Sequence, residues 1–262
     1  MIRTIAVEGA RLVYEDVGSG DPLLCVHGFG GSRASWEPIW RTITAGRRGL
    51  RLDQRGFGES IASAAVDYSH ADDLLALMDD AGVARCDLIG FSLGGAVSLQ
   101  FALDHPERVR RLVLIAPALF GWDWSEAWRS EWRAVTTHAR AGDMESARRR
   151  WLAHPMFTAA MRNPGHAAIM REEIALFPGQ QWVEADGQRP TGSDLERIDI
   201  LAMPCLLLTG EQDVTDLREI ADLLPVLSDQ VQRLDYPGCG HMLMLEASNR
   251  VAADINRFLA TG

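Results

Sequence analysis

Short, nearly continuous apolar runs, separated by longer stretches with helical spacing, limit the possible folds of this chain more than any other pattern in it. The runs cover residues 23–27, 87–91, 112–116 and 205–209. Strands that helices cover on both faces lack polar alternation and read as continuous apolar runs. Their alternation with helical stretches is typical of a parallel sheet. We therefore predict an α/β fold, built on a mostly parallel, doubly wound sheet of about eight strands.

Other periodicities place an edge hairpin and several helices. Residues 4–7 and 11–17 alternate between apolar and polar side chains, which predicts an antiparallel hairpin at the edge of the sheet. Residues 69–81, 93–103 and 249–259 carry apolar side chains at intervals of three and four, which predicts amphipathic helices.

A long segment in the second half of the chain contains no strand pattern. It begins after the apolar run that ends near residue 116 and stops before the run that begins at residue 205. We expect residues 118–203 to form a helical cap, inserted into a core that consists of residues 1–117 and 204–262.

Helix starts and tryptophans characterise the expected cap. Asp123 followed by Glu126 forms an N-cap pattern, and so does Asn163 followed by Pro164. Six of the eight tryptophans lie in this segment. Three of them follow one another at intervals of four, on one side of one helix: Trp124, Trp128 and Trp132. This stripe either packs the cap internally and onto the core or forms an aromatic roof over a substrate pocket.

The composition excludes several classes of function. The 36 acidic and 26 basic residues give a net charge of −10, and every basic residue is arginine. A negative net charge repels phosphate backbones and anionic lipid surfaces. The absence of lysine excludes Schiff-base and Walker-type chemistry, and no zinc-type or dinucleotide-type motif occurs. We expect no nucleic-acid or membrane partner, no metal and no cofactor.

The sequence also predicts a cytoplasmic protein. The amino terminus has no apolar leader pattern, and no stretch approaches about 18 uninterrupted apolar residues. The four cysteines lie far apart without CxxC spacing, which favours reduced thiols. The sequence leaves the oligomeric state open.

A G-x-S-x-G motif points to the chemistry. Residues 90–94 read GFSLG and separate an apolar run from an amphipathic stretch. A serine on such a sharp strand-to-helix turn has a strained backbone, which requires small neighbours such as Gly90, Gly94 and Gly95. A serine hydroxyl becomes a nucleophile when an imidazole accepts its proton and a carboxylate orients that imidazole. We predict that Ser92 is a nucleophile.

The base and the acid are expected at the ends of other strands. His241 lies in a glycine-rich turn before the C-terminal helix and is the predicted base; His70, at a helix start, is a distant rival. Asp213 follows the last of the apolar runs and is the predicted acid, with Glu211 and Asp216 as local alternatives. The resulting order of nucleophile, acid and base is the one known for G-x-S-x-G hydrolytic folds.

Two backbone N–H groups are predicted to bind the oxyanion that forms when a carbonyl is attacked. The first belongs to Leu93, which follows the nucleophile at a helix N-terminus. The second belongs to Phe29, in the glycine-rich loop after an apolar run. His27 in the same loop is expected to form structural hydrogen bonds.

The motifs HGFG, DQRGFGES, GFSLGG, GEQD and GCGHM resemble, in this order, those of α/β-hydrolases with a helical cap. The resemblance spans nearly the whole expected core. It implies Ser92 as nucleophile, Asp213 as acid and His241 as base, with an oxyanion hole from Phe29 and Leu93. Dehalogenases and epoxide hydrolases of this superfamily have aspartate as nucleophile, so the serine disfavours those activities.

Residues 148–155 read RRRWLAHP and resemble the cap segment of 3-oxoadipate enol-lactonase-like and related small esterases. The resemblance implies that Trp151 contacts the substrate. We also expect Leu119, Val214 and Met242 to line the pocket. Arg55 either anchors the substrate or organises its own loop.

These observations predict a serine hydrolase that cleaves a small, fairly apolar carboxylic ester or lactone through an acyl-enzyme. The same residues are compatible with a hydrolase of C–C bonds or with a cofactor-free perhydrolase. A third hypothesis is a ligand sensor that uses the pocket with slow or no turnover. Analysis of products and of turnover distinguishes the three.

Overall fold

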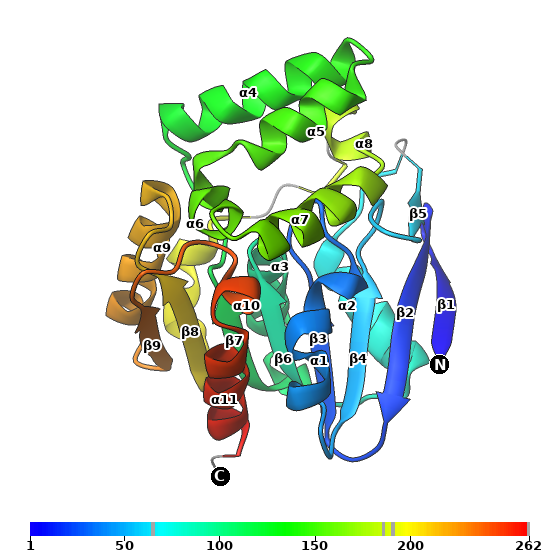
Figure 1. Ribbon diagram of the computed structural model, residues 1–262. Coiled ribbons are helices and arrows are strands. Elements are labelled where there is room, and N and C mark those ends of the chain that lie inside the picture. Colours follow the sequence, from blue (N-terminus) through cyan, green and yellow to red (C-terminus); the bar gives the residue numbers. More distant parts are fainter. Residues whose placement is uncertain (64–65, 185–186, 190–191, 261–262) are drawn as a thin grey trace.

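The computed structural model describes residues 1–63, 66–184, 187–189 and 192–260. Within them one sheet forms the centre of the molecule (Figure 1). Its strands are β1 Ile2–Val7, β2 Ala10–Gly18, β3 Pro22–Val26, β4 Arg48–Asp53, β5 Ile61–Ala62, β6 Cys86–Phe91, β7 Val109–Ile115, β8 Cys205–Gly210 and β9 Val231–Tyr236. The strand order is β1-β2-β4-β3-β6-β7-β8-β9, and the short β5 pairs with β2.

The pairing directions confirm the predicted fold class. All neighbouring strands from β4 to β9 are parallel, whereas β1 and β2 form the antiparallel hairpin expected at the edge. The sheet has nine strands where about eight were expected. Strand β4 has no clear apolar pattern because Arg51 lies in its middle, and this arginine is buried through ion pairs with Glu15 and Glu37.

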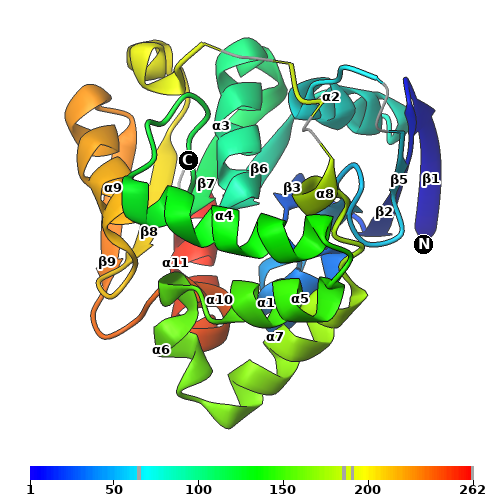
Figure 2. The same cartoon turned by 90° about the horizontal axis from the view of Figure 1, so that it is seen from above.

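Helices cover both faces of the sheet. The core helices are α1 Glu37–Ile43, α2 His70–Asp80, α3 Leu93–Asp104, α9 Thr215–Leu227, α10 Leu243–Glu246 and α11 Ser248–Leu259. Helices α2, α3 and α9 pack on one face, and α1 and α11 pack on the other (Figure 2). Successive residues of β3 accordingly belong to different apolar clusters, Leu24 with the first group of helices and Leu23 with the second.

The remaining helices lie over the carboxyl ends of the parallel strands, and we call them the cap (Figure 1). They are α4 Glu126–Arg140, α5 Met144–Leu152, α6 Thr158–Met161, α7 Pro164–Leu176 and α8 Gln180–Val183. Five 3-10 helices also occur within the described residues: η1 Arg33–Trp36, η2 Pro106–Arg108, η3 Pro155–Phe157, η4 Asp194–Glu196 and η5 Ile198–Ile200. Seen from above, α4 crosses over the sheet (Figure 2). Among the described residues, the helices are too short or too polar to span a bilayer.

Of the two helix starts predicted in this segment, one is confirmed and one is wrong. Asn163 caps α7, as expected, by accepting hydrogen bonds from the backbone of the first turn. The predicted cap at Asp123 is wrong, because α4 starts later and Ser125 is its N-cap. Asp216 in the core binds both the backbone N–H and the hydroxyl of Ser125, at 2.7 Å each, and so fixes the start of this helix.

Candidate active site

Ser92 occupies the sharp turn between β6 and α3. Its φ and ψ angles are 53° and −116°, a strained conformation for a residue with a side chain. The turn is held by backbone hydrogen bonds: the Ser92 N–H donates to the carbonyl of Ile115, and the Ser92 carbonyl accepts from Gly95 and Ala118. The serine side chain is therefore fixed at the carboxyl edge of the sheet.

The glycines around Ser92 are required by close backbone contacts. A Cβ atom on Gly94 would overlap the carbonyl oxygen of Val26, and one on Gly90 would overlap the backbone of Gly94. A Cβ atom on Gly95 would lie 2.7 Å from the Cβ of Pro117. The G-x-S-x-G pattern thus records how tightly strand, turn and helix pack.

A continuous hydrogen-bonded chain joins three side chains from distant parts of the sequence. Ser92 Oγ lies 3.0 Å from Nε2 of His241, and Nδ1 of His241 lies 2.8 Å from Oδ2 of Asp213. His241 and Asp213 are both buried. Because an ionised carboxylate only accepts hydrogen bonds, Nδ1 carries the ring proton and Nε2 is free to accept the serine proton.

The loop that carries His241 is fixed on both sides of the histidine. Glu246 in α10 accepts a hydrogen bond from the backbone N–H of Gly240 at 2.8 Å and another from that of Met242 at 3.0 Å. One carboxylate therefore holds the two N–H groups that flank His241. This contact fixes the backbone on both sides of the imidazole.

The alternatives for acid and base have other partners. Asp216 holds the start of α4, and Glu211 accepts a hydrogen bond from the backbone of Gly238. His70 lines the same cavity as Ser92, where its ring packs edge-on against Tyr68. The structure brings Asp213 and His241, rather than these residues, into the chain with Ser92.

The two predicted oxyanion donors lie beside Ser92. Among the described residues, neither the Leu93 N–H nor the Phe29 N–H has an acceptor. The loop of Phe29 packs against the serine, since a Cβ atom on Gly28 would lie 3.2 Å from Cβ of Ser92. His27 is fully buried beneath it, with Nδ1 bonded to the Gly28 carbonyl and Nε2 accepting from the Gln54 N–H. Burial lowers the pKa of His27, which keeps the ring neutral.

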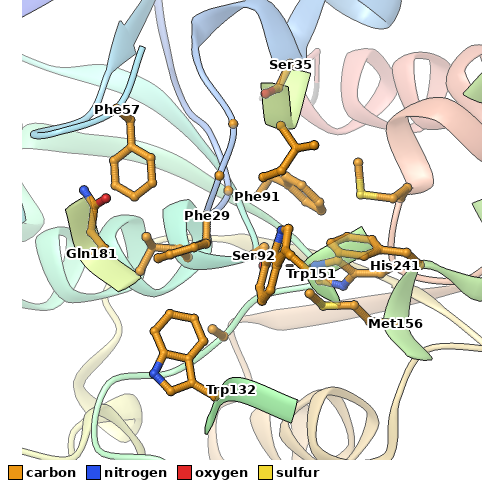
Figure 3. Close-up of a pocket in the computed structure, with 18 of the residues that line it drawn as sticks. Phe29, Ser35, Phe57, Phe91, Ser92, Trp132, Trp151, Met156, Gln181 and His241 are labelled. Carbon is orange, nitrogen blue, oxygen red and sulfur yellow. Dashed lines mark hydrogen bonds between the residues drawn. The ribbon is translucent and has the colours of Figure 1, made fainter. Parts of the chain in front are cut away.

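Ser92 and His241 open into a cavity of about 520 Å³ between the sheet and the cap (Figure 3). Phe29 projects into its centre and packs against Trp132 and Trp151, with ring centroids 5.2 Å from its own in both cases. Met156 lines the wall near His241 (Figure 3), and Met242, the residue after His241, also lines the cavity. The surroundings of the serine are therefore mainly aromatic and aliphatic.

Two of the four residues that were expected to line the pocket do so in the structure. Trp151 and Met242 line the cavity, but Leu119 and Val214 do not. Leu119 is buried in the apolar core, while its neighbours Ala118 and Phe120 face the cavity. Val214 packs between the two apolar clusters, and its N–H donates to Asp213.

Two open questions from the sequence are answered by contacts. All three residues of the tryptophan stripe line the cavity, although Trp124 precedes α4 and stacks on Trp128 rather than belonging to the helix. Arg55 forms a buried two-pronged ion pair with Asp73 and lies over the ring of Tyr68. Arg55 therefore organises its own loop.

Sequence reasoning missed several lining residues, among them Phe57, Gln181, Ser35 and Glu173. Phe57 lies in the DQRGFGES motif, where no periodicity indicates the direction of its side chain. One sequence pattern could have indicated Glu173. It lies three residues after Met170 and next to Ile174, so a carboxyl shares the apolar side of α7.

The fold and the site define a class of proteins: hydrolases whose serine lies on a nucleophile elbow at the carboxyl edge of an α/β sheet. Residues 21–248 match the family model of the alpha/beta hydrolase fold. The chain therefore belongs to the α/β hydrolase fold family, and its predicted assignment to hydrolytic enzymes is confirmed.

Several similar proteins match nearly the whole length of this chain. The 2-hydroxymuconate semialdehyde hydrolase of Pseudomonas sp. (strain CF600) is 28% identical, over 98% of this chain and 93% of the relative. The structure of an esterase from Rhodococcus sp. ECU1013 is similar with a TM-score of 0.85 and 25% identity, over 99% of this chain and 98% of that chain. The enol-lactonase from Burkholderia xenovorans LB400 shares the fold, with a TM-score of 0.84 and 20% identity, over 99% of this chain and 100% of that chain.

Proposed function

We propose that this protein hydrolyses small, fairly apolar carboxylic esters or lactones through an acyl-enzyme intermediate. The observation that carries the proposal is the hydrogen-bonded chain of Ser92, His241 and Asp213 at the wall of an aromatic cavity. The substrate is a small molecule because the cavity is about 520 Å³, within the range of small-ligand sites.

In the proposed mechanism Asp213 holds the Nδ1 proton of His241, so that Nε2 accepts the proton of Ser92. Ser92 Oγ attacks the carbonyl carbon, and the imidazolium then protonates the leaving alcohol. Water, deprotonated by the same Nε2, attacks the acyl-enzyme and releases the acid. Each step needs the proton carrier within hydrogen-bond reach of the serine, which the distance of 3.0 Å provides.

The negative charge that develops on the carbonyl oxygen is stabilised by the N–H groups of Phe29 and Leu93. Leu93 is the first residue of α3, so its N–H also lies at the positive end of a helix dipole. The mainly apolar walls lower the local dielectric constant and so strengthen these interactions. Trp151 and Met242, which line the cavity, are the proposed substrate contacts.

The proposal is tested with a fluorophosphonate probe and mass spectrometry of the labelled peptides. The expected result is a single adduct on Ser92 and rapid hydrolysis of p-nitrophenyl butyrate. Ser92→Ala should abolish labelling and lower turnover by up to about six orders of magnitude, because the members of such a triad act as a unit. Ser130→Ala, which changes an exposed serine of α4, serves as the matched control. Undiminished ester hydrolysis by Ser92→Ala would contradict the proposal.

A second candidate is the hydrolysis of C–C bonds, and the similarity to a 2-hydroxymuconate semialdehyde hydrolase over 98% of this chain favours it. The two candidates are separated by comparing kcat/KM for p-nitrophenyl butyrate and for a vinylogous diketone. We expect the ester to be the better substrate. A preference for the diketone, with a carboxylic acid and an enol or ketone as the products of C–C cleavage, would replace the ester assignment.

A further inference from the structure

One carboxyl group lies in the mainly apolar wall of the cavity. Glu173 is the only acidic residue that lines it among the described residues. The two arginines that also line it, Arg129 and Arg133, are exposed on α4 and form ion pairs with Asp123 and Glu126. Those arginines belong to the outer rim, whereas Glu173 is partly buried.

Glu173 is held by a hydroxyl group of the core. The Ser35 hydroxyl, in η1, donates a hydrogen bond to Oε1 of Glu173, and Ser35 Oγ in turn accepts from the Ser32 N–H at 3.2 Å. Burial raises the pKa of Glu173, and the hydrogen bonds from Ser35 and Ser32 oppose the shift. A carboxyl group in such surroundings costs free energy unless polar partners satisfy its oxygens.

The position of this carboxyl relative to Ser92 follows from one tight turn. A Cβ atom on Gly28 would lie 3.2 Å from Cβ of Ser92, and one on Gly31 would lie 3.2 Å from Oε1 of Glu173. The Gly31 N–H bonds to the Gly28 carbonyl, so the two Cα atoms lie within about 7 Å of each other. The nucleophile and the carboxyl therefore lie at opposite ends of the same turn and line the same cavity. In Figure 3, Ser35 marks this end of the cavity.

We propose, on the basis of the proposed ester hydrolysis, that Glu173 and Ser35 form a binding site for a hydroxyl group on the acyl chain of the substrate. The substrate hydroxyl donates to a carboxylate oxygen of Glu173, which has lone pairs beyond the one that Ser35 uses. The preferred substrate is thus a hydroxylated ester or lactone. A substrate with a carboxylate at this position is disfavoured, because two like charges would meet in an apolar cavity.

The test compares esters that differ only in the hydroxyl group. Ethyl butyrate is paired with ethyl 3-hydroxybutyrate, and ethyl hexanoate with ethyl 6-hydroxyhexanoate, so that the hydroxyl moves along the chain. Acid release is followed in a pH-stat. We expect wild type to prefer one hydroxylated ester over its partner in kcat/KM. Glu173→Leu should lower that ratio about tenfold or more, as is typical for the loss of a hydrogen bond to a charged group.

Controls separate binding from structural roles. Glu172→Leu, an exposed neighbour on α7, should leave the ratio unchanged. Ser35→Ala should lower the ratio less than Glu173→Leu does, and it decides the question if Glu173→Leu does not fold. Monoethyl succinate, which carries a carboxylate, should be a poor substrate for wild type and a better one for Glu173→Gln.

Three outcomes would overturn the inference. One is a wild-type enzyme with no preference for any hydroxylated ester. Another is an equal loss of activity toward both members of a pair in Glu173→Leu and in Ser35→Ala, which would assign these residues to the positioning of the cap. The third is a wild-type preference for monoethyl succinate. A wild type that hydrolyses none of these esters would instead refute the proposed function itself.

Discussion

Ser92 and His241 reach the cavity from turns at the ends of strands, whereas Trp132 and Trp151 reach it from helices of the cap. On the core side, backbone contacts fix each reactive group: the strained Ser92 turn packs against Val26, and Glu246 holds the loop of His241. On the cap side, side chains pack against side chains around Phe29.

The core side therefore holds the reactive groups, and the cap side shapes the cavity that selects the substrate. An added methyl group at Gly94 would collide with backbone, which cannot move without displacing a strand. A changed side chain at Trp132 alters the shape of the cavity and leaves the hydrogen-bonded chain of Ser92 untouched. We therefore expect substitutions on the core side to change kcat and substitutions on the cap side to change the choice of substrate.

The strongest test of this comparison is Asp213→Asn. An asparagine of the same shape allows the wrong imidazole tautomer, and kcat toward p-nitrophenyl butyrate should fall by about 10⁴-fold while the melting temperature changes little. Glu211→Gln, the neighbouring acid that binds the Gly238 N–H, is the matched control and should stay within about threefold of wild type. A large loss in Glu211→Gln with an active Asp213→Asn would reverse the assignment of the acid.

Trp132→Ala should give a smaller and selective effect. Removing the indole enlarges the cavity, so kcat/KM for p-nitrophenyl octanoate relative to the acetate should rise about tenfold, as expected when pocket volume decides between chain lengths. Thr137→Ala changes an exposed residue of the same helix and should not alter the ratio. An equal drop in kcat for both esters would show that the cap side also positions the catalytic groups.

The smallest effect on catalysis is expected at the place where the chain returns from cap to core. Asp194 in η4 is fully buried, and among the described residues neither carboxyl oxygen accepts a hydrogen bond; the nearest cation, Arg197, lies 3.9 Å away. Burial raises the pKa of Asp194 from 3.8 to about 7. The folded state therefore retains this proton more strongly than the unfolded state, and stability falls as the pH rises from about 4 to about 7.

Asp194→Asn should remove this dependence. The variant should melt at least about 5 °C above wild type at about pH 8, where wild type buries a charge, and close to it at about pH 4. Thermal unfolding at both pH values measures the effect, and ester turnover should change little. Equal shifts in the melting temperature at the two pH values would show that the charge of Asp194 is not the cause.

Local sequence patterns predict most of the strands and the turn that holds Ser92. Strands β3, β6, β7 and β8 are continuous apolar runs because both of their faces are covered, and the small residues around Ser92 record the turn itself. Strand β4 has no local apolar pattern, because it contains the charged residue Arg51. This arginine is buried there only because carboxylates from two other elements form ion pairs with it. The positions of Leu119 and Val214 depended likewise on contacts that are distant in sequence.

The amino-acid pattern alone predicts an α/β sheet with a serine, an aspartate and a histidine at the ends of its strands. It can do so because strand period, turn geometry and glycine spacing are local properties. Which cap side chains face the cavity depends on how the cap helices pack. The spacing of Met170, Glu173 and Ile174 shows that they share one side of a helix, but the packing of that helix against η1 directs Glu173 to Ser35. The rotation of a helix about its axis is set by its neighbours, and no local pattern encodes it.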